Sequence, residues 1–168
     1  MQITEILNPS HRNRKKEFSC GKSLLDDYFK RQASQDVERK LSACFVSIDK
    51  ETGLIKGYYT LSNNSIPSNR IPDNYKKHFP DSYTSIPTTL LGRLAVDTRF
   101  QQQGLGKLLL IDALKKSFDI SKTIGSFAVI VDPIDNEAEN YYEKFGFIML
   151  PDSRKMFLPM KTIKRLFD

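Results

Sequence analysis

A chain of 168 residues is long enough to form one domain with a hydrophobic core, and we expect a single domain over residues 1–168. Its 39% apolar and 27% charged residues exclude a disordered chain, and no apolar run reaches the length of a membrane span. The formal net charge of +6 suits an anionic partner, although a solvated basic surface explains the charge equally well.

Cysteine and histidine are too sparse to predict a metal site. Cys20 and Cys44 lack the spacing of metal ligands, and we expect both to be reduced and structural. His11 and His78 are far apart in the sequence. The first twelve residues contain no signal-peptide core, so the cytoplasm is the expected compartment.

The N-terminal half predicts a strand, a helix and a hairpin. Residues 2–7 form a short apolar strand pattern. Ser23 is a suitable helix N-cap, with Asp26 three residues later, and the helix is expected to run to about Lys40. Strands over 41–49 and 54–62 flank a polar turn. Four prolines in residues 63–89 predict a long loop with one short helix at 73–78.

The second half alternates strands with helices. Residues 90–96 predict a buried strand, and apolar residues then recur at helical spacing from 105, at Leu105, Leu108, Leu109, Ile111 and Phe118. A strand over 125–131, a helix over 136–145, strands over 147–150 and 155–158, and a helix over 160–167 follow. This order predicts the α/β class, with a mixed sheet and helices on both of its faces.

The turn between the strand at 90–96 and the next helix predicts an anion site. Gly104 and Gly106 lack a β-carbon, so the backbone there can approach a ligand closely. Unpaired N–H groups and the helix dipole favour a phosphate at this point. A P-loop is excluded because no Lys-Ser or Lys-Thr follows Gly106, and a dinucleotide loop because Leu109 replaces its third glycine. An ordinary strand-to-helix turn explains the two glycines alone equally well.

Two sequence blocks resemble the GNAT family of N-acetyltransferases. Gln101-x-x-Gly104-x-Gly106 is similar to the family's (Arg/Gln)-x-x-Gly-x-(Gly/Ala) signature, and residues 135–147, which end in Tyr142-x-x-x-Gly146-Phe147, are similar to its second conserved block. The resemblance implies the GNAT fold, a central twisted mixed sheet flanked by helices in which two parallel strands splay apart. It also implies acetyl-CoA as cosubstrate and no metal.

The resemblance also assigns the residues that hold the coenzyme. A strand edge with unpaired backbone groups must satisfy them, and the pantetheine arm adds to such an edge like a further strand. Gln101 stands where the family more often has arginine, and Arg99 is a candidate substitute. The implied coenzyme-binding residues are Leu94, Ala95, Val96, Arg99, Gln101, Gln102, Gln103, Gly104, Leu105, Gly106 and Lys107.

Acetyl transfer from a thioester to an amine needs a neutral amine and a proton for the departing thiolate. An α-amine, with a pKa of about 7.7–8.0, is partly neutral at pH 7, whereas a lysine amine at about 10.4 needs a strong base. No histidine lies near the turn, which favours an α-amine acceptor, although a glutamate base stays open. By resemblance Tyr142 donates the proton. Core packing is the alternative for Tyr142, and the neighbouring Tyr141 faces elsewhere. Arg93 is either an ion-pair partner or an acceptor-binding group.

The N-terminal half is similar to the acetyltransferase toxins of bacterial type II toxin–antitoxin systems. The similarity rests on Phe18-x-Cys20-Gly21, on Gly57-Tyr58-Tyr59 and on residues 91–97. It implies acetylation of the α-amine of aminoacyl-tRNA, which stops translation. The alternatives are an acetyltransferase for a small amine or a protein amine, and a regulatory module that binds acetyl-CoA without catalysis. Candidate partners are an aminoacyl-tRNA, a ribbon-helix-helix-type antitoxin and a second copy of the chain in a homodimer.

Overall fold

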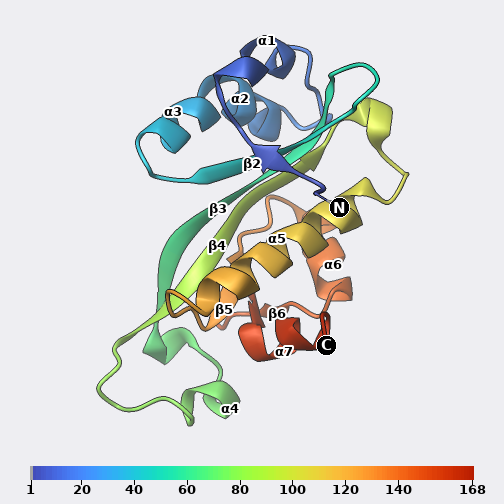
Figure 1. Ribbon diagram of the computed structural model, residues 1–168. Coiled ribbons are helices and arrows are strands. Elements are labelled where there is room, and N and C mark those ends of the chain that lie inside the picture. Colours follow the sequence, from blue (N-terminus) through green and yellow to red (C-terminus); the bar gives the residue numbers. More distant parts are fainter. Residues whose placement is uncertain (1) are drawn as a thin grey trace. The chain divides into compact units, whose positions relative to one another are not determined.

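The computed structural model describes residues 2–168, in which hydrogen bonds join seven strands into one sheet in the order β1-β2-β3-β4-β5-β7-β6 (Figure 1). β4 and β5 are parallel and the other described pairs are antiparallel, so the predicted α/β class with a mixed sheet is confirmed. The chain groups into two compact units. The first comprises the chain up to Ser62 with Gly92–Ala113, and the second comprises Asn63–Leu91 with Leu114–Asp168. A single domain over 1–168 stays a prediction.

The first unit contains the N-terminal elements and the ends of two long strands. Its antiparallel pairs join β1 to β2 and β2 to β3, with Glu5 opposite Val46 and Phe45 opposite Tyr59. The elements that lie in this unit, in whole or in part, are β1 (Glu5–Ile6), η1 (Pro9–His11), α1 (Arg12–Lys15), α2 (Ser23–Arg31), α3 (Ala33–Glu38), β2 (Ala43–Ile48), β3 (Ile55–Pro67), β4 (Ser85–Val96), η3 (Thr98–Phe100) and α5 (Leu105–Ser121).

Two neighbouring tyrosines of β3 place helices on both faces of the sheet in this unit. Successive strand residues point to opposite faces. The Tyr58 ring stacks on Phe29 of α2 with centroids 4.2 Å apart, and its hydroxyl donates to the Leu25 carbonyl at 2.8 Å. The Tyr59 hydroxyl donates to Asp112 of α5 at 2.6 Å. The predicted arrangement of helices on both faces is therefore confirmed here.

The prediction of one helix from Ser23 to about Lys40 is wrong. The segment forms α2 and α3, which are separated at Gln32, where φ is −121° and the helical path is interrupted. Ser23 is the first helical residue instead of the N-cap, and the N-cap is Lys22. Asp26 does not complete a capping box, because its carboxylate accepts from the Cys20 N–H at 2.8 Å.

In the second unit, strands extend into both ends of the predicted 63–89 loop. β3 continues to Pro67 and β4 begins at Ser85, so the irregular segment is shorter than the prolines predicted. Ile66 and Ile86 in these extensions are buried in a core with Phe157, which explains why the strands continue. The predicted short helix is confirmed as α4 (Asp73–Lys76), and η2 (Ser68–Arg70) precedes it.

The remaining elements lie where the sequence predicted them, with shorter bounds. β4 pairs with β5 (Ala128–Val131) only over Thr89–Leu91 within the described ladder, and β5 pairs with β7 (Met156–Pro159), which pairs with β6 (Ile148–Met149). The helices are α6 (Asn136–Lys144) and α7 (Met160–Arg165). Leu108 of α5 is exposed, so its predicted place on the buried face is wrong, whereas Leu105 and Leu109 are buried. Cys20 and Cys44 are both free and buried, as predicted.

Candidate active site

Asp97 fixes the turn that follows β4. Its side chain is 1% exposed and accepts hydrogen bonds from the backbone N–H groups of Ser19 (3.1 Å) and Arg99 (2.9 Å). The Arg99 guanidinium adds two more, from Nε and Nη2, both at 2.9 Å. Burial disfavours the carboxylate, but these hydrogen bonds and the Arg99 charge outweigh it and hold the pKa of Asp97 below its usual value. Sequence reasoning assigned this residue no role, although an aspartate between a strand and a turn is a common cap.

The side chains of Arg99 and Gln101 support the turn. Both hydrogen-bond donors of the Gln101 amide are engaged, with the Cys20 carbonyl at 3.0 Å and the Val96 carbonyl at 2.8 Å. Besides its contacts with Asp97, Arg99 donates from Nη2 to the Glu17 carbonyl at 3.2 Å. Gln101, which stands where the family more often has arginine, and Arg99, its candidate substitute, therefore both stabilise the loop. The backbone N–H groups of the turn are the donors that this arrangement presents to an anion.

Two residues of the turn, one of them a predicted glycine, adopt a left-handed backbone. Gln102 and Gly104 have φ values of +61° and +80°, the left-handed region that favours glycine. A β-carbon at Gly104 meets nothing within 4 Å, so the φ value and not packing requires glycine there. The Leu108 N–H donates to the Gly104 carbonyl at 3.2 Å and begins α5. The N–H groups of residues 105–107 thus lie in the first helical turn, at the positive end of the dipole.

Most side chains of the predicted loop are available at the surface. Within α5, Leu105 is buried and anchors the helix start, and Gly106 is half-buried. The exposed residues of the loop are Gln101, Gln102, Gln103, Gly104 and Lys107. The structure brings all of these residues together with the end of β4 in the first unit.

Gly57 of β3 lies directly against the predicted coenzyme edge, Leu94–Val96. A β-carbon at Gly57 would lie 2.8 Å from the Ala95 carbonyl oxygen and 2.7 Å from Leu109 Cδ1. Only a glycine permits this approach, because real β-carbons do not come so close to backbone atoms. The Asp97 N–H also donates to the Lys56 carbonyl at 2.8 Å. β3 therefore fixes the edge, a role that sequence reasoning missed although a glycine within a strand is a recognised signal of close backbone approach.

Arg93 contacts a ring and not a carboxylate. Its guanidinium carbon lies 3.5 Å from the centroid of the Tyr28 ring, a cation–π contact, and no ion pair of Arg93 is found among residues 2–168, so of the two roles considered for it the ion pair is not supported. The Tyr28 hydroxyl donates to Asp36 at 2.8 Å. Burial raises the pKa of Tyr28, and the hydrogen bond to Asp36 adds to the shift. Arg93 thus ties β4 to α2 in the first unit.

Tyr142 belongs to the second unit, on α6. Asp135 caps this helix and accepts from the Ala138 N–H at 2.8 Å. The Tyr142 side chain is buried, and its ring meets that of Phe147 with centroids 5.3 Å apart. Burial raises the pKa of Tyr142, with a further contribution from Tyr141. Both effects favour the neutral phenol, which carries its proton.

The expectation that Tyr141 faces away from Tyr142 is wrong, because the two rings lie edge to face with centroids 5.6 Å apart. The Tyr141 ring also contacts Phe145 with centroids 5.3 Å apart. Its hydroxyl is buried and finds no hydrogen-bond partner among residues 2–168, and burial raises its pKa.

Among residues 2–168, no group of three or more His, Cys, Asp or Glu side chains is arranged to hold a metal ion. No helix among the described residues is long and apolar enough to cross a membrane.

Comparison with known proteins finds relatives over nearly the whole chain. The acetyltransferase (GNAT) domain matches residues 41–149. The tRNA-acetylating toxin of Mycobacterium tuberculosis is 34% identical over 150 residues, which cover 89% of this chain and 87% of that protein. A crystal structure of a tyrosine-to-phenylalanine mutant of KacT superposes with a TM-score of 0.90 and 27% identity, over 98% of both chains.

Two further solved structures are complexes of AtaT. AtaT with acetyl-methionyl-tRNAfMet has a TM-score of 0.89 and 27% identity over 98% of both chains. A tyrosine-to-phenylalanine mutant of AtaT, bound to acetyl-CoA and the C-terminus of the antitoxin AtaR, has a TM-score of 0.79 and 25% identity, over 98% of this chain and 96% of that one. The chain belongs to the GNAT family and is an acetyltransferase.

Proposed function

We propose that this protein transfers the acetyl group of acetyl-CoA to the α-amine of an aminoacyl-tRNA and thereby acts as a toxin that blocks translation. The observation that carries the proposal is the likeness over 98% of both chains to AtaT, which was solved with acetyl-methionyl-tRNAfMet. The relative from Mycobacterium tuberculosis, a tRNA-acetylating toxin, supports the same acceptor. The protein acts in the cytoplasm, where charged tRNA is found.

The first unit holds the coenzyme. Its pyrophosphate lies on the turn at residues 101–107, where left-handed backbone at Gln102 and Gly104 and the first N–H groups of α5 form an anion site. Lys107 is exposed beside these groups and adds a positive charge. The pantetheine arm adds to the backbone edge at Leu94–Val96, which Gly57 and Asp97 hold in position. Arg99 and Gln101 contribute indirectly, because their hydrogen bonds stabilise the turn.

Tyr142 supplies the proton for the departing thiolate. The amine nitrogen attacks the thioester carbonyl carbon, the carbon–sulfur bond breaks, and the sulfur takes the proton from the Tyr142 hydroxyl. The proton that the acylated nitrogen loses passes through solvent and restores the Tyr142 phenol. A phenol, with an ordinary pKa of about 10, carries its proton at neutral pH, and burial raises the pKa of Tyr142 further. Two of the solved structures, of KacT and of AtaT, are tyrosine-to-phenylalanine mutants, which is consistent with a tyrosine of functional interest in these toxins.

The acceptor needs little help to lose its proton. With a pKa of about 7.7–8.0, a fair fraction of an α-amine is neutral at pH 7.

A toxin that blocks translation also needs a partner that inhibits it. The AtaT structure with the C-terminus of AtaR supports an antitoxin as this partner. The resemblance to type II toxins implies an antitoxin of the ribbon-helix-helix class.

Cell-free translation tests the proposal. Protein synthesis is expected to stop when both this protein and acetyl-CoA are present, and to continue when either is omitted. Addition of freshly charged tRNA after the protein has been removed should restore synthesis. Continued synthesis with both components, or an arrest that does not need acetyl-CoA, would count against the toxin function and favour an acetyltransferase for a small amine or a protein.

A further inference from the structure

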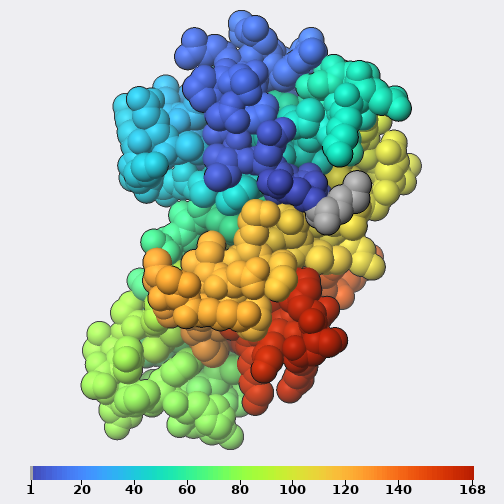
Figure 2. All heavy atoms as spheres, viewed as in Figure 1, coloured from blue at the N-terminus to red at the C-terminus, as the bar shows by residue number. Residues whose placement is uncertain are grey.

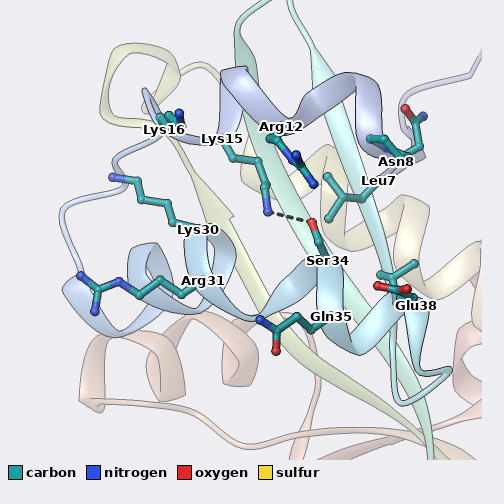
Figure 3. A pocket seen from close by; sticks show the side chains of 12 residues that line it. Leu7, Asn8, Arg12, Lys15, Lys16, Lys30, Arg31, Ser34, Gln35 and Glu38 are labelled. Carbon is teal, nitrogen blue, oxygen red and sulfur yellow. Dashed lines mark hydrogen bonds between the residues drawn. The ribbon is translucent and has the colours of Figure 1, made fainter.

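A basic cavity of about 680 Å³ lies in the first unit, apart from the residues of the coenzyme turn. Residues of η1, α1, α2 and α3 line it (Figure 3), and in Figure 2 blue atoms of the N-terminal segment lie beside the lighter blue atoms of the segment that follows it. Glu38 is the carboxylate among the lining residues. The lining cations are Arg12, Lys15, Lys16, Lys30 and Arg31. This excess of positive charge around one concave site favours an anionic ligand.

Lys15 brings a buried positive charge to this cavity. The residue is 7% exposed, and its ammonium group donates to the Ser34 hydroxyl at 2.7 Å (Figure 3). The hydroxyl is neutral, so this hydrogen bond does not balance the ammonium charge, and burial lowers the pKa of Lys15. An anion in the cavity would balance it. The Ser34 hydroxyl accepts from Lys15 and retains its own proton to donate to the same anion.

The other cations gather at one side of the cavity. In Figure 3, Lys16, Lys30 and Arg31 lie on the side away from Glu38. These three side chains are exposed, so they can reach a ligand at the cavity mouth. A guanidinium binds two oxygens of one phosphate, and ammonium groups add point charges, which suits a chain of phosphates. Glu38 repels anions at the opposite end and so gives the site a direction.

Short connections link the cavity to the coenzyme turn within the first unit. The segment between α1 and α2 contributes the Cys20 carbonyl to Gln101, at 3.0 Å, and the Ser19 carbonyl to the Thr98 N–H, at 2.8 Å. α2, which carries Lys30 and Arg31, begins at Ser23. An RNA bound in the cavity is thereby connected through these hydrogen bonds to the coenzyme turn. The coenzyme does not need the cavity, because the turn has phosphate donors of its own.

We propose that this cavity binds backbone phosphates of the acceptor RNA through the buried Lys15, the Ser34 hydroxyl that accepts from it, and the other four cations of the lining. The inference rests on the proposed function and narrows it, because it concentrates RNA binding in one pocket and does not spread it over the basic surface. An acidic peptide is the alternative ligand. The RNA is favoured because the guanidinium, ammonium and hydroxyl donors match a tetrahedral phosphate with oxygens on several sides.

The test compares charge reversals inside and outside the cavity. Lys30→Glu/Arg31→Glu changes the mouth, and Lys161→Glu/Lys164→Glu makes the same charge change on α7, outside the cavity. Binding of deacylated tRNA is measured by filter binding over a range of salt concentrations. The cavity variant should bind at least about 10-fold more weakly, and its salt slope should fall by about 1 for each phosphate that the protein no longer neutralises. The α7 variant should stay close to the unmodified protein. Ser34→Ala, a small change at an exposed position, should weaken binding by a few fold.

Two further measurements keep the outcomes distinct. Acetyl-CoA affinity should be equal in all variants, which also shows that they are folded, and poly-glutamate should compete poorly with tRNA. Equal loss in the cavity and α7 variants, loss of acetyl-CoA binding, or loss of poly-glutamate binding with tRNA binding retained would each overturn the cavity assignment. Acetyl transfer to charged tRNA by the unmodified protein measures the proposed function separately, so the cavity assignment can fail while that function stands.

Discussion

Tyr142 and Tyr141 are adjacent, but the mechanism gives only one of them a chemical task. Tyr142→Phe keeps the ring and its packing on Phe147 and removes the proton donor. Turnover should fall about 100-fold or more, the scale of general acid catalysis, with acetyl-CoA affinity nearly unchanged. Steady-state kinetics and calorimetry measure the two quantities.

Tyr141→Phe is the matched control for this prediction. The Tyr141 hydroxyl is buried without a partner in the described chain, so its removal leaves no donor or acceptor stranded. Activity should be retained and stability unchanged or slightly higher. A fully active Tyr142→Phe enzyme would remove Tyr142 from the mechanism.

Gly57 shows how one residue sets the geometry of a strand edge. In Gly57→Ala the new β-carbon would meet the Ala95 carbonyl oxygen at 2.8 Å, and the backbone must move. We expect a loss of about 1–3 kcal/mol of folding free energy and a raised KM for acetyl-CoA, because the edge at Leu94–Val96 shifts. Gly125→Ala is the control, since a β-carbon there meets nothing within 4 Å. Equal unfolding midpoints for the two variants would contradict this reading.

At the scale of elements, the strand–turn–helix unit from β4 to α5 depends on the charge of Asp97. Its folded-state pKa lies below the unfolded value of about 3.9, so the stability that it contributes is present above pH 4 and is lost as the pH falls through the folded pKa. Asp97→Asn should cost about 1–3 kcal/mol at pH 7. Denaturant unfolding should show the difference shrinking towards pH 3.

The exposed Asp81→Asn should show no such pH-dependent difference from the unmodified protein. The free energy of unfolding of the Asp97→Asn protein could instead differ from that of the unmodified protein by the same amount at pH 7 and pH 3. The carboxylate charge would then not be what holds the turn.

The turn itself is tested by Gly104→Glu. The position has room for a side chain but a φ of +80°, and it faces the start of α5. Glutamate would place negative charge where the pyrophosphate is proposed to bind, and would add strain of about 1–2 kcal/mol. Calorimetry should show acetyl-CoA affinity lowered at least about 10-fold, a loss of about 1.4 kcal/mol. Unchanged affinity would move the coenzyme site elsewhere.

For the whole molecule, local patterns predicted what depends on local chemistry. The glycine turn and the α6 helix lie where sequence reasoning placed them, whereas the strand before the turn is half-buried over residues 90–96, where only Leu91 and Ala95 are buried. The ends of β3 and β4 were missed because prolines and polar residues dominate 63–89, while Ile66 and Ile86 share a core with Phe157, which lies far along the chain. The close approach at Gly57 likewise depends on Ala95 and Leu109, which are distant in sequence.

The basic cavity was beyond the reach of sequence patterns for the same reason. Arg12 and Lys15 are separated from Lys30 and Ser34 by the segment that joins α1 to α2, and only the folded chain shows that they share one concavity. Sequence reasoning also took Gln101 and Arg99 as free donors, because it could not see the carbonyls and the carboxylate that occupy them.

The most direct test of the central claim follows the acetyl group itself. The purified protein is incubated with labelled acetyl-CoA and charged tRNA, with free amino acid and deacylated tRNA in parallel reactions, and the aminoacyl-adenosine end is analysed by mass spectrometry. The account predicts one acetyl group on the α-amine of the charged tRNA, and none on either control. Efficient acetylation of a polyamine or free lysine, with the charged tRNA untouched, would contradict it.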